Sequence, residues 1–227
     1  MKKEYPKIVA LSGKKSSGKG ECCKFATKFF ENKGKSVKVF SFAGPLKKLC
    51  IEILGLLPEQ VYGTEEQKNS LTRYSWENLP HYMSLCNNIS WNNIGSSKKP
   101  VAVWPKGLMT ARQVLQEVGT GIFRRMYANI WNEALLRDIK KWNGDVALVD
   151  DMRFPDEFKA LSEAGAIKIR LTRNVKVDGD NHASETSLDS PKFDWNLFDV
   201  IINNQDMDIE MQNIHLEHEM SKIEWLK

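Results

Sequence analysis

Hydrophobic positions along this chain follow two different periods. Short apolar or alternating runs, which are typical of strands, occupy residues 7–13, 36–42, 145–151, 167–173 and 199–204. Apolar residues at helical spacing occupy the segments 19–32, 45–57, 110–142, 155–164 and 206–225. Strands that alternate with helices predict an α/β fold, in which a central parallel sheet carries helices on both faces.

Proline and glycine mark several of the expected helix ends. Pro45 suits the first turn of the helix that it begins. The sequence of residues 32–34 closes the first helix, and Gly165 ends the fourth. Residues 119–121, Gly-Thr-Gly, predict a break in the longest helical segment.

Residues 58–107 lack a clear hydrophobic period and are rich in Asn, Ser, Trp and Tyr. We interpret them as an insertion, or a substrate-covering region, built from short elements. The stretch 174–194 is polar and also lacks a period, which is typical of a long loop.

The chain has 227 residues, of which 41% are hydrophobic and 27% charged, as in an ordinary globular protein with one domain. No apolar run approaches the roughly 20 residues that cross a bilayer, and the short run after the basic start does not suit a secretory signal. We therefore expect a cytoplasmic protein without a membrane partner. Four cysteines without zinc-binding spacing are expected to be reduced and mostly buried.

The net charge of +4 is a weak excess, and the sequence has no RNP-type, zinc-finger or helix-turn-helix signature. A nucleic acid is therefore not the expected partner. A small phosphorylated substrate explains the charge equally well.

The stretch SGKKSSGKGECCK, residues 12–24, carries the spacing of a phosphate-binding loop. Gly13, four further residues, Gly18 and Lys19 lie between a predicted strand and a predicted helix, which is the context that such a loop requires. Its main-chain N–H groups converge on phosphate oxygens, while the lysine reaches the β- and γ-phosphates. The sequence therefore predicts a nucleotide site.

The residue after Gly20 is the unusual one in this loop. In adenylate-kinase-like nucleoside monophosphate kinases the corresponding run is G-K-G-T, so Glu21 stands where a threonine is expected. Its carboxylate has three interpretations: a first-turn acid that favours the helix dipole, a ligand of Mg²⁺, or a charge that repels ATP. The position favours the metal role.

Three further stretches predict a second substrate that carries phosphate. FAGPLKKL contains Lys47, ARQVLQEVGTGIFR contains Arg112, and VDDMRFPDE contains Asp151, Arg153 and Glu157. Arginine can bind phosphate through two parallel hydrogen bonds. The alternative for each stretch is structural: a surface charge on a helix, or aspartates that cap the next helix.

Taken in order, the blocks SG…GK, AGPLKK, RQ.LQ..GT, W...L, V.DD.RF..E, H.SE and D..I.N resemble the deoxynucleoside monophosphate kinases of bacteriophages. The resemblance extends from about residue 7 to 204 and is weak in 58–107. It implies an adenylate-kinase-like P-loop fold of three layers, αβα, as a single kinase domain over residues 1–227 with a lid at about 174–197. It also implies transfer of phosphate from ATP, with Mg²⁺, to a deoxynucleoside monophosphate in the cytoplasm of a host cell.

The resemblance implies a role for each matching residue. The ATP site would contain Gly13, Ser16, Ser17, Gly18, Lys19, Gly20, Glu21, Cys22 and, from the lid, Arg173. The substrate site would contain Lys15, Lys47, Lys68, Arg112, Gly119, Thr120, Trp131, Asp151, Arg153 and Glu157. The catalytic cations would be Lys15, Lys19, Arg112 and Arg153, and the metal ligand would be Glu21. His182, Ser184 and Glu185 match the H-x-S-E block of the lid.

Several alternatives stay open at this point. The chain could be another small-molecule P-loop kinase, such as one that acts on dephospho-coenzyme A. It could also be a non-catalytic nucleotide-binding protein with a degenerate loop, or a nucleic-acid binder. The preferred base, the sugar and a homodimer are not determined by the sequence.

Overall fold

The computed structural model describes residues 5–79, 90–93, 100–103, 105–173 and 186–223. The chain forms two compact units, which we describe separately. The first unit comprises Met1–Phe42 and Asn132–Lys227, and the second comprises Ala43–Trp131. The predicted insertion 58–107 lies within the second unit, while the assignment of the whole chain to one domain stays a prediction.

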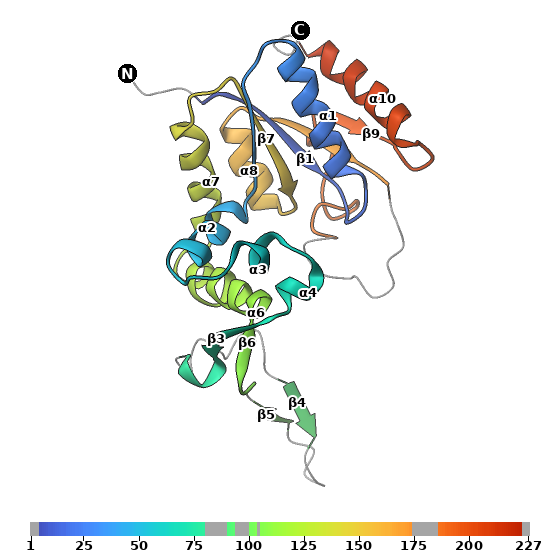
Figure 1. The fold of residues 1–227 in the computed structure, drawn as a ribbon. Helices are drawn as coiled ribbons and strands as arrows, with labels where there is room; N and C mark the ends of the chain where they lie inside the picture. The colour runs from blue at the N-terminus through green and yellow to red at the C-terminus, as the bar shows by residue number, and fades with distance from the viewer. Residues whose placement is uncertain (1–4, 80–89, 94–99, 104, 174–185, 224–227) are drawn as a thin grey trace. The chain divides into compact units, whose positions relative to one another are not determined.

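A five-stranded parallel sheet forms the centre of the first unit (Figure 1). Its strands are β1 (Lys7–Ser12), β2 (Val37–Phe40), β7 (Val146–Met152), β8 (Ile167–Leu171) and β9 (Val200–Ile202), in the spatial order β2-β7-β1-β8-β9. All four neighbouring pairs are parallel. The sequence predicted all five strands, although each is shorter than or shifted from the expected range. Because β1 is central, the loop after it lies between the ends of β7 and β8.

Helices cover both faces of this sheet. Helices α1 (Lys19–Asn32) and α10 (Ile209–Lys222) pack on one face, with Val9 and Leu11 of β1 in the same core cluster. Helices α7 (Ile130–Lys141) and α8 (Pro155–Glu163) pack on the other face, with Ile8 and Ala10. Successive strand residues point to opposite faces, so both layers of helices are buried against one strand. The predicted three-layer αβα arrangement is confirmed.

The second unit consists of short elements around its own core. In chain order these are α2 (Gly44–Glu52), α3 (Pro58–Tyr62), α4 (Glu65–Lys68), β3 (Leu71–Ser75), a 3₁₀ turn (Trp76–Asn78), β4 (Ser90–Asn93), β5 (Pro100–Val103), β6 (Leu108–Thr110), α6 (Ala111–Gln116) and a π-helix (Glu117–Arg124). Strand β3 pairs antiparallel with β6, and β4 pairs antiparallel with β5. The core includes Cys50, Trp76 and Met109. The expectation of short elements in the insertion is confirmed.

Two predicted helix boundaries are wrong. The helix expected over 45–57 ends at Glu52, because the chain turns at Gly55, whose φ is 64°. The break expected at 119–121 does not occur there: the helix widens to a π-helix and leaves the helical path only at residue 127. A Cβ atom on Gly119 would lie 2.6 Å from Leu46 Cδ2, so this glycine serves close packing and does not end the helix.

The described cysteines are buried thiols. Cys22, Cys23 and Cys50 are free and buried, and burial raises their pKa values to about 12, 12 and 11. This confirms the expectation for these three residues, while Cys86 lies outside the described residues. Within the described part of the chain, no helix combines the length and the apolar character that a membrane span needs.

Candidate active site

The loop after β1 has the backbone conformation of a phosphate-binding turn. Ser16 and Gly18 both adopt positive φ values, 60° and 96°, and the Ser17 N–H donates to the Lys14 carbonyl oxygen at 3.2 Å. Alternation between right- and left-handed backbone directs successive N–H groups into one concavity. The N-terminus of α1 begins at Lys19, directly behind this turn. The predicted strand–loop–helix context is therefore confirmed.

The side chain of Lys19 folds back over this turn. Its Nζ atom donates to the carbonyl oxygens of Gly13 and Lys14, both at 2.6 Å. A lysine ammonium has three donors and no acceptor, so two of its three bonds are made to the loop itself. The positive charge is thus held at the rim of the turn, where a phosphate chain would bind.

The last strand and the last helix support the other side of this loop. Asn204 Nδ2 donates to the Ser17 carbonyl oxygen at 2.8 Å and to Gln212 Oε1 at 2.5 Å. A Cβ atom on Gly18 would lie 2.5 Å from Gln212 Oε1. Gly18 is therefore required twice, for its positive φ and for the close approach of α10. By contrast, a Cβ on Gly20 would meet nothing within 4 Å.

The two residues after Gly20 point to different surroundings. The Glu21 carboxylate forms an exposed ion pair with Lys24 at 2.8 Å, in the first turn of α1. The Cys22 side chain is fully buried, and its Sγ accepts from Gln212 Nε2 at 3.1 Å. Cys22 can therefore reach a nucleotide only through its main chain. The ion pair agrees with the helix-dipole interpretation of Glu21, while its metal role stays a prediction.

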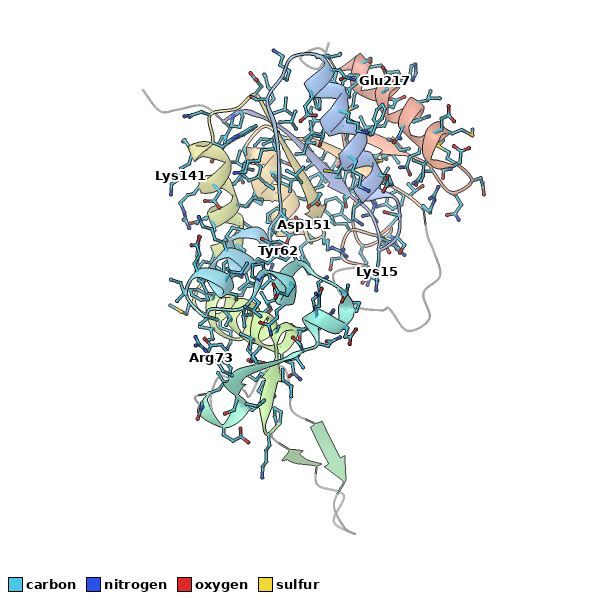
Figure 2. All side chains as sticks on the ribbon, viewed as in Figure 1. Lys15, Tyr62, Arg73, Lys141, Asp151 and Glu217 are labelled. Carbon is cyan, nitrogen blue, oxygen red and sulfur yellow. The ribbon has the colours of Figure 1, made fainter. Side chains whose placement is uncertain are left out.

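Asp151 and Glu157 hold the main chain just beyond two neighbouring strands, β2 and β7. Asp151, which is labelled in Figure 2, accepts through Oδ1 from the Phe42 N–H at 2.8 Å. Glu157 Oε2 accepts from the N–H groups of Arg153 and Phe154 at 2.8 and 3.1 Å, which caps the start of α8. Burial raises the pKa of Glu157 to about 7. The start of α8 is thus capped by Glu157, whereas the structural alternative named the aspartates that precede it.

Arg173, expected to close over the phosphates, lies at the end of β8. Its Nε donates to the Asn204 carbonyl oxygen at 3.0 Å, and its Nη2 donates to the Met207 carbonyl oxygen. The Arg173 N–H also donates to Asn204 Oδ1 at 2.8 Å. The arginine is therefore bound to the same residue that supports Ser17. His182, Ser184 and Glu185 lie outside the described residues.

In the second unit, the structure brings two of the predicted substrate cations together. Arg112 Nη2 lies 2.5 Å from Glu65 Oε2, and Lys68 Nζ lies 3.8 Å from Glu65 Oε1. Lys68 comes from the poorly matching insertion, so its sequence assignment was the weakest. Lys68 and Arg112 contact the same carboxylate, and the substrate role of Lys68 stays a prediction.

Lys47 lies near the same short segment. Its Nζ atom is 4.7 Å from the centre of the Tyr62 ring, and Tyr62 precedes Glu65 by three residues. Three predicted cations, Lys47, Lys68 and Arg112, therefore contact residues 62–65. Arg112 and Lys68 share the Glu65 carboxylate, so together these three side chains carry one net positive charge.

The π-helix carries Gly119 and Thr120, and Trp131 of α7 contacts it. The Trp131 indole N–H donates to the Gly119 carbonyl oxygen at 3.0 Å, and its ring packs against Phe123 at 5.4 Å between centroids. Trp131 is buried, while Thr120 is exposed. The indole thus supports the irregular helix, and Thr120 is the residue of this block that is open to a ligand.

Sequence reasoning missed Glu65, Asn204 and Gln212, whose contacts are described above, and also Asp189, whose carboxylate lies 2.9 Å from Lys14 Nζ of the loop. A signal existed only for Asn204, the last residue of the block D..I.N, to which no role was assigned. Asp199, the first residue of that block, accepts from the Lys168 N–H at 2.7 Å and pairs with its ammonium at 2.8 Å. The block thus fixes β9 against β8.

Comparison with known proteins decides the family. Residues 79–214, more than half of the chain, match the sequence model of the family described as deoxynucleotide monophosphate kinase. The chain belongs to this family. It is also 27% identical over 209 residues to a protein of Acanthamoeba polyphaga mimivirus that carries the provisional name deoxynucleotide monophosphate kinase, covering 87% of this chain and 88% of that protein.

The match to the deoxynucleotide monophosphate kinase family begins at residue 79, so it does not include the loop of residues 12–24. It does include Arg112, Trp131, Asp151 and Arg173. The evidence for the nucleotide loop of this kinase is therefore its own geometry, and the two lines of evidence are independent. The predicted enzyme class, a phosphotransferase acting on nucleotides, is confirmed.

Proposed function

We propose that this kinase transfers the γ-phosphoryl group of ATP to a deoxynucleoside monophosphate. An oxygen of the acceptor phosphate bonds to the γ-phosphorus as its bond to the β–γ bridging oxygen breaks, which gives a deoxynucleoside diphosphate and ADP. The observation that carries the proposal is the contact of Lys19 with Gly13 and Lys14 in the loop between β1 and α1. That arrangement has the donors for a triphosphate and no feature of a covalent mechanism.

In the proposed donor site, Lys19 exchanges its two loop carbonyls for phosphate oxygens. The exchange costs little, because a charge-assisted bond to phosphate replaces two bonds to neutral acceptors. Gly13, Ser16, Gly18 and Gly20 would contribute main-chain N–H groups, while the N–H groups of Ser17 and Cys22 already donate to the Lys14 and Gly18 carbonyl oxygens and shape the loop and the start of α1. The positive end of α1 adds attraction for the same anion. Arg173, at the end of β8, would add a further cation.

In the proposed acceptor site, Arg112, Lys68 and Lys47 bind the monophosphate. Their common contact with residues 62–65 supports a shared anion site in the second unit. Lys15 and Arg153 would offset the repulsion between the two nucleotides. Thr120 is the exposed candidate for a hydrogen bond, while Gly119, Trp131, Asp151 and Glu157 act through the main-chain contacts described above.

The residues present fit a Mg²⁺ ion that is bound mainly through the substrate. Within the described residues, no group of three or more His, Cys, Asp or Glu side chains is placed to hold a metal alone. Mg²⁺ in kinases needs only one or two carboxylates besides phosphates and water. Glu21, in the first turn of α1, would supply one carboxylate. When bound, the ion neutralises phosphate charge.

The experiment is an ADP-release assay with ATP and a panel of acceptors: dGMP, dTMP, dCMP, dAMP, hydroxymethyl-dCMP and their ribose forms. We expect ADP release to require a deoxynucleoside monophosphate, and the product to be the matching diphosphate. Dephospho-coenzyme A is the control acceptor. Release with that acceptor alone, or no release with any acceptor, would reject the proposal.

A further inference from the structure

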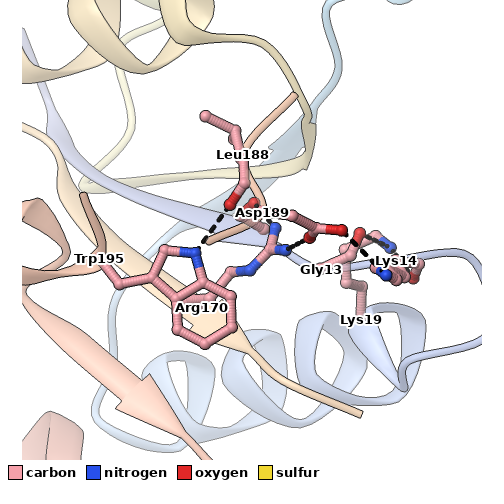
Figure 3. A network of polar contacts seen from close by, with 8 residues as sticks. Gly13, Lys14, Lys19, Arg170, Leu188, Asp189 and Trp195 are labelled. Carbon is pink, nitrogen blue, oxygen red and sulfur yellow. Dashed lines mark hydrogen bonds and ion pairs between the residues drawn. The ribbon is translucent and has the colours of Figure 1, made fainter. Parts of the chain in front are cut away.

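Asp189 joins two cations beside the nucleotide loop (Figure 3). Its Oδ2 atom lies 2.9 Å from Lys14 Nζ, and its Oδ1 atom accepts from Arg170 Nη2 at 2.7 Å. Only 5% of the Arg170 side chain and 20% of the Asp189 side chain are exposed. Ion pairs at such partly buried positions are screened much less than surface pairs, so this bridge is held in one geometry.

Arg170 is fixed by further contacts. Its Nη1 atom donates to Ser12 Oγ at 2.8 Å, and its guanidinium lies 5.3 Å from the centre of the Trp195 ring. The Trp195 indole N–H in turn donates to the Leu188 carbonyl oxygen at 2.8 Å. Asp189 is therefore held from both sides, by its neighbour Leu188 and by the arginine that it binds.

The two cations of this bridge act on both sides of Gly13. Arg170 contacts Ser12, which precedes Gly13, and Lys14 follows it. The carbonyl oxygens of Gly13 and Lys14 are the acceptors of Lys19. Fixing Ser12 and Lys14 thus fixes the two carbonyls that hold the Lys19 ammonium.

We propose that Asp189 is a positioning residue of the donor site, which acts through Lys14 and Arg170 on the start of the loop. The adjacent lysines then have different tasks: the Lys14 ammonium anchors the loop, and the exposed Lys15 is the lysine of this pair that faces nucleotides. This inference depends on the proposed function for its kinetic consequences but not for its structural ones.

The test compares Lys14→Met and Asp189→Asn with Lys159→Met, which removes an exposed lysine that pairs with Glu163 at 3.9 Å on α8. Hydrogen exchange of the loop amides, residues 13–18, reports the loop without any need for activity. KM is measured separately for ATP and for the deoxynucleotide. The double variant K14M/D189N tests whether Asp189 acts through Lys14.

We expect loop amides to exchange about tenfold faster, and KM for ATP to rise about tenfold, in both single variants, which corresponds to about 1.4 kcal/mol. KM for the acceptor should stay within about twofold, and K159M should match the wild type. The double variant should resemble D189N. D189N removes the carboxylate that pairs with the buried Arg170 side chain, which is strongly destabilising. If D189N does not fold, the K14M variant alone tests the inference.

Loop exchange that is unchanged in K14M would overturn the inference. So would KM values that rise equally for both substrates, or effects of the two substitutions that simply add. A wild type that releases no ADP with any acceptor would reject the proposed function instead, and the exchange measurement would still judge the role of Asp189.

Discussion

Arg112 and Glu65 form an ion pair of 2.5 Å across 47 positions of the chain, and Lys68 approaches the other oxygen of the same carboxylate. A carboxylate that bridges two cations occupies the kind of site that a phosphate group prefers. In the proposed reaction, Glu65 therefore competes with the acceptor for Arg112 and Lys68. The pair is largely exposed, so the competition is weak and readily reversed.

Glu65→Gln should lower KM for the deoxynucleotide by about threefold, which is the scale of one exposed ion pair. KM for ATP should not change. Glu66→Gln, which removes the charge of the neighbouring residue on α4, is the matched control. A rise in the acceptor KM would mean that Glu65 holds the two cations in place and does not compete with the substrate.

Arg112→Ala should raise KM for the deoxynucleotide, or lower kcat with it, by a combined factor that corresponds to roughly 2–4 kcal/mol. The loss follows from one charge-assisted contact to phosphate, and Arg153→Ala should act in the same direction. Steady-state kinetics with each substrate varied in turn gives the measurement. Arg137→Ala, which removes an exposed arginine paired with Glu133 on α7, is the control. If only KM for ATP changes, Arg112 belongs to the ATP site, and the donor and acceptor sites have been exchanged in our assignment.

Lys19→Ala should lower kcat by a factor on the order of 10² or more while the protein stays folded. The Lys19 ammonium bonds to the carbonyl oxygens of Gly13 and Lys14 in the structure. In the variant, this ammonium would be absent and could not stabilise the phosphoryl group during its transfer. Circular dichroism and the rate of ADP release are measured on the same sample. Lys28→Ala, an exposed lysine on the same helix, should leave kcat unchanged. Near-normal turnover of the Lys19 variant would falsify the assignment of the loop.

Glu157 should make stability depend on pH in an unusual direction. Burial raises its pKa to about 7, so between pH 4.5 and 7 the folded state binds a proton that the unfolded state has released. Its contribution is therefore most favourable at low pH and declines as pH rises to about 7, by on the order of 3 kcal/mol. Urea unfolding at several pH values measures this decline, and Glu157→Gln should remove it.

Glu163→Gln, at an exposed position of the same helix, controls for the loss of a charge on α8. It should keep the pH dependence of the wild type. If the wild type and Glu157→Gln give parallel curves, the Glu157 carboxylate has an ordinary pKa.

Glu21→Thr should remain active and should shift the Mg²⁺ optimum. The substitution replaces a carboxylate that now pairs with Lys24 by the hydroxyl of a G-K-G-T loop. A Mg²⁺ titration of kcat/KM at fixed ATP gives the measurement for both proteins. Superimposable titrations would remove Glu21 from the metal site. If the wild type is inactive at every Mg²⁺ concentration and Glu21→Thr is active, the loop is degenerate.

The layers of the fold could be predicted from the sequence because the strands of the sheet are short apolar or alternating runs that are separated by segments with helical spacing. Ile8 to Leu11 illustrate the reason: both faces of β1 are covered, so every residue must be apolar. The end of α2 could not be predicted in this way, because the apolar spacing continues past Gly55, while the positive φ of that glycine belongs to the backbone alone.

The candidate site was predictable where a local motif fixes it. Gly13, Gly18 and Lys19 are close in sequence, so their spacing carries the geometry. Glu65 and Asp189 are different, since their partners Arg112 and Lys14 are far away along the chain. A carboxylate of this type has no signature of its own, and only the folded chain shows which cation it meets.

The contact between Gln212 and Gly18 has a consequence for how the protein is made. Gln212 and Gly18 are separated by 194 positions, so the ribosome synthesises the loop early and Gln212 late. Bringing two such distant segments together lowers the conformational entropy of the chain, and the contacts of the complete sheet offset this cost. A growing chain therefore contains the whole nucleotide motif well before it contains Gln212, whose side-chain amide contacts the Gly18 carbonyl oxygen.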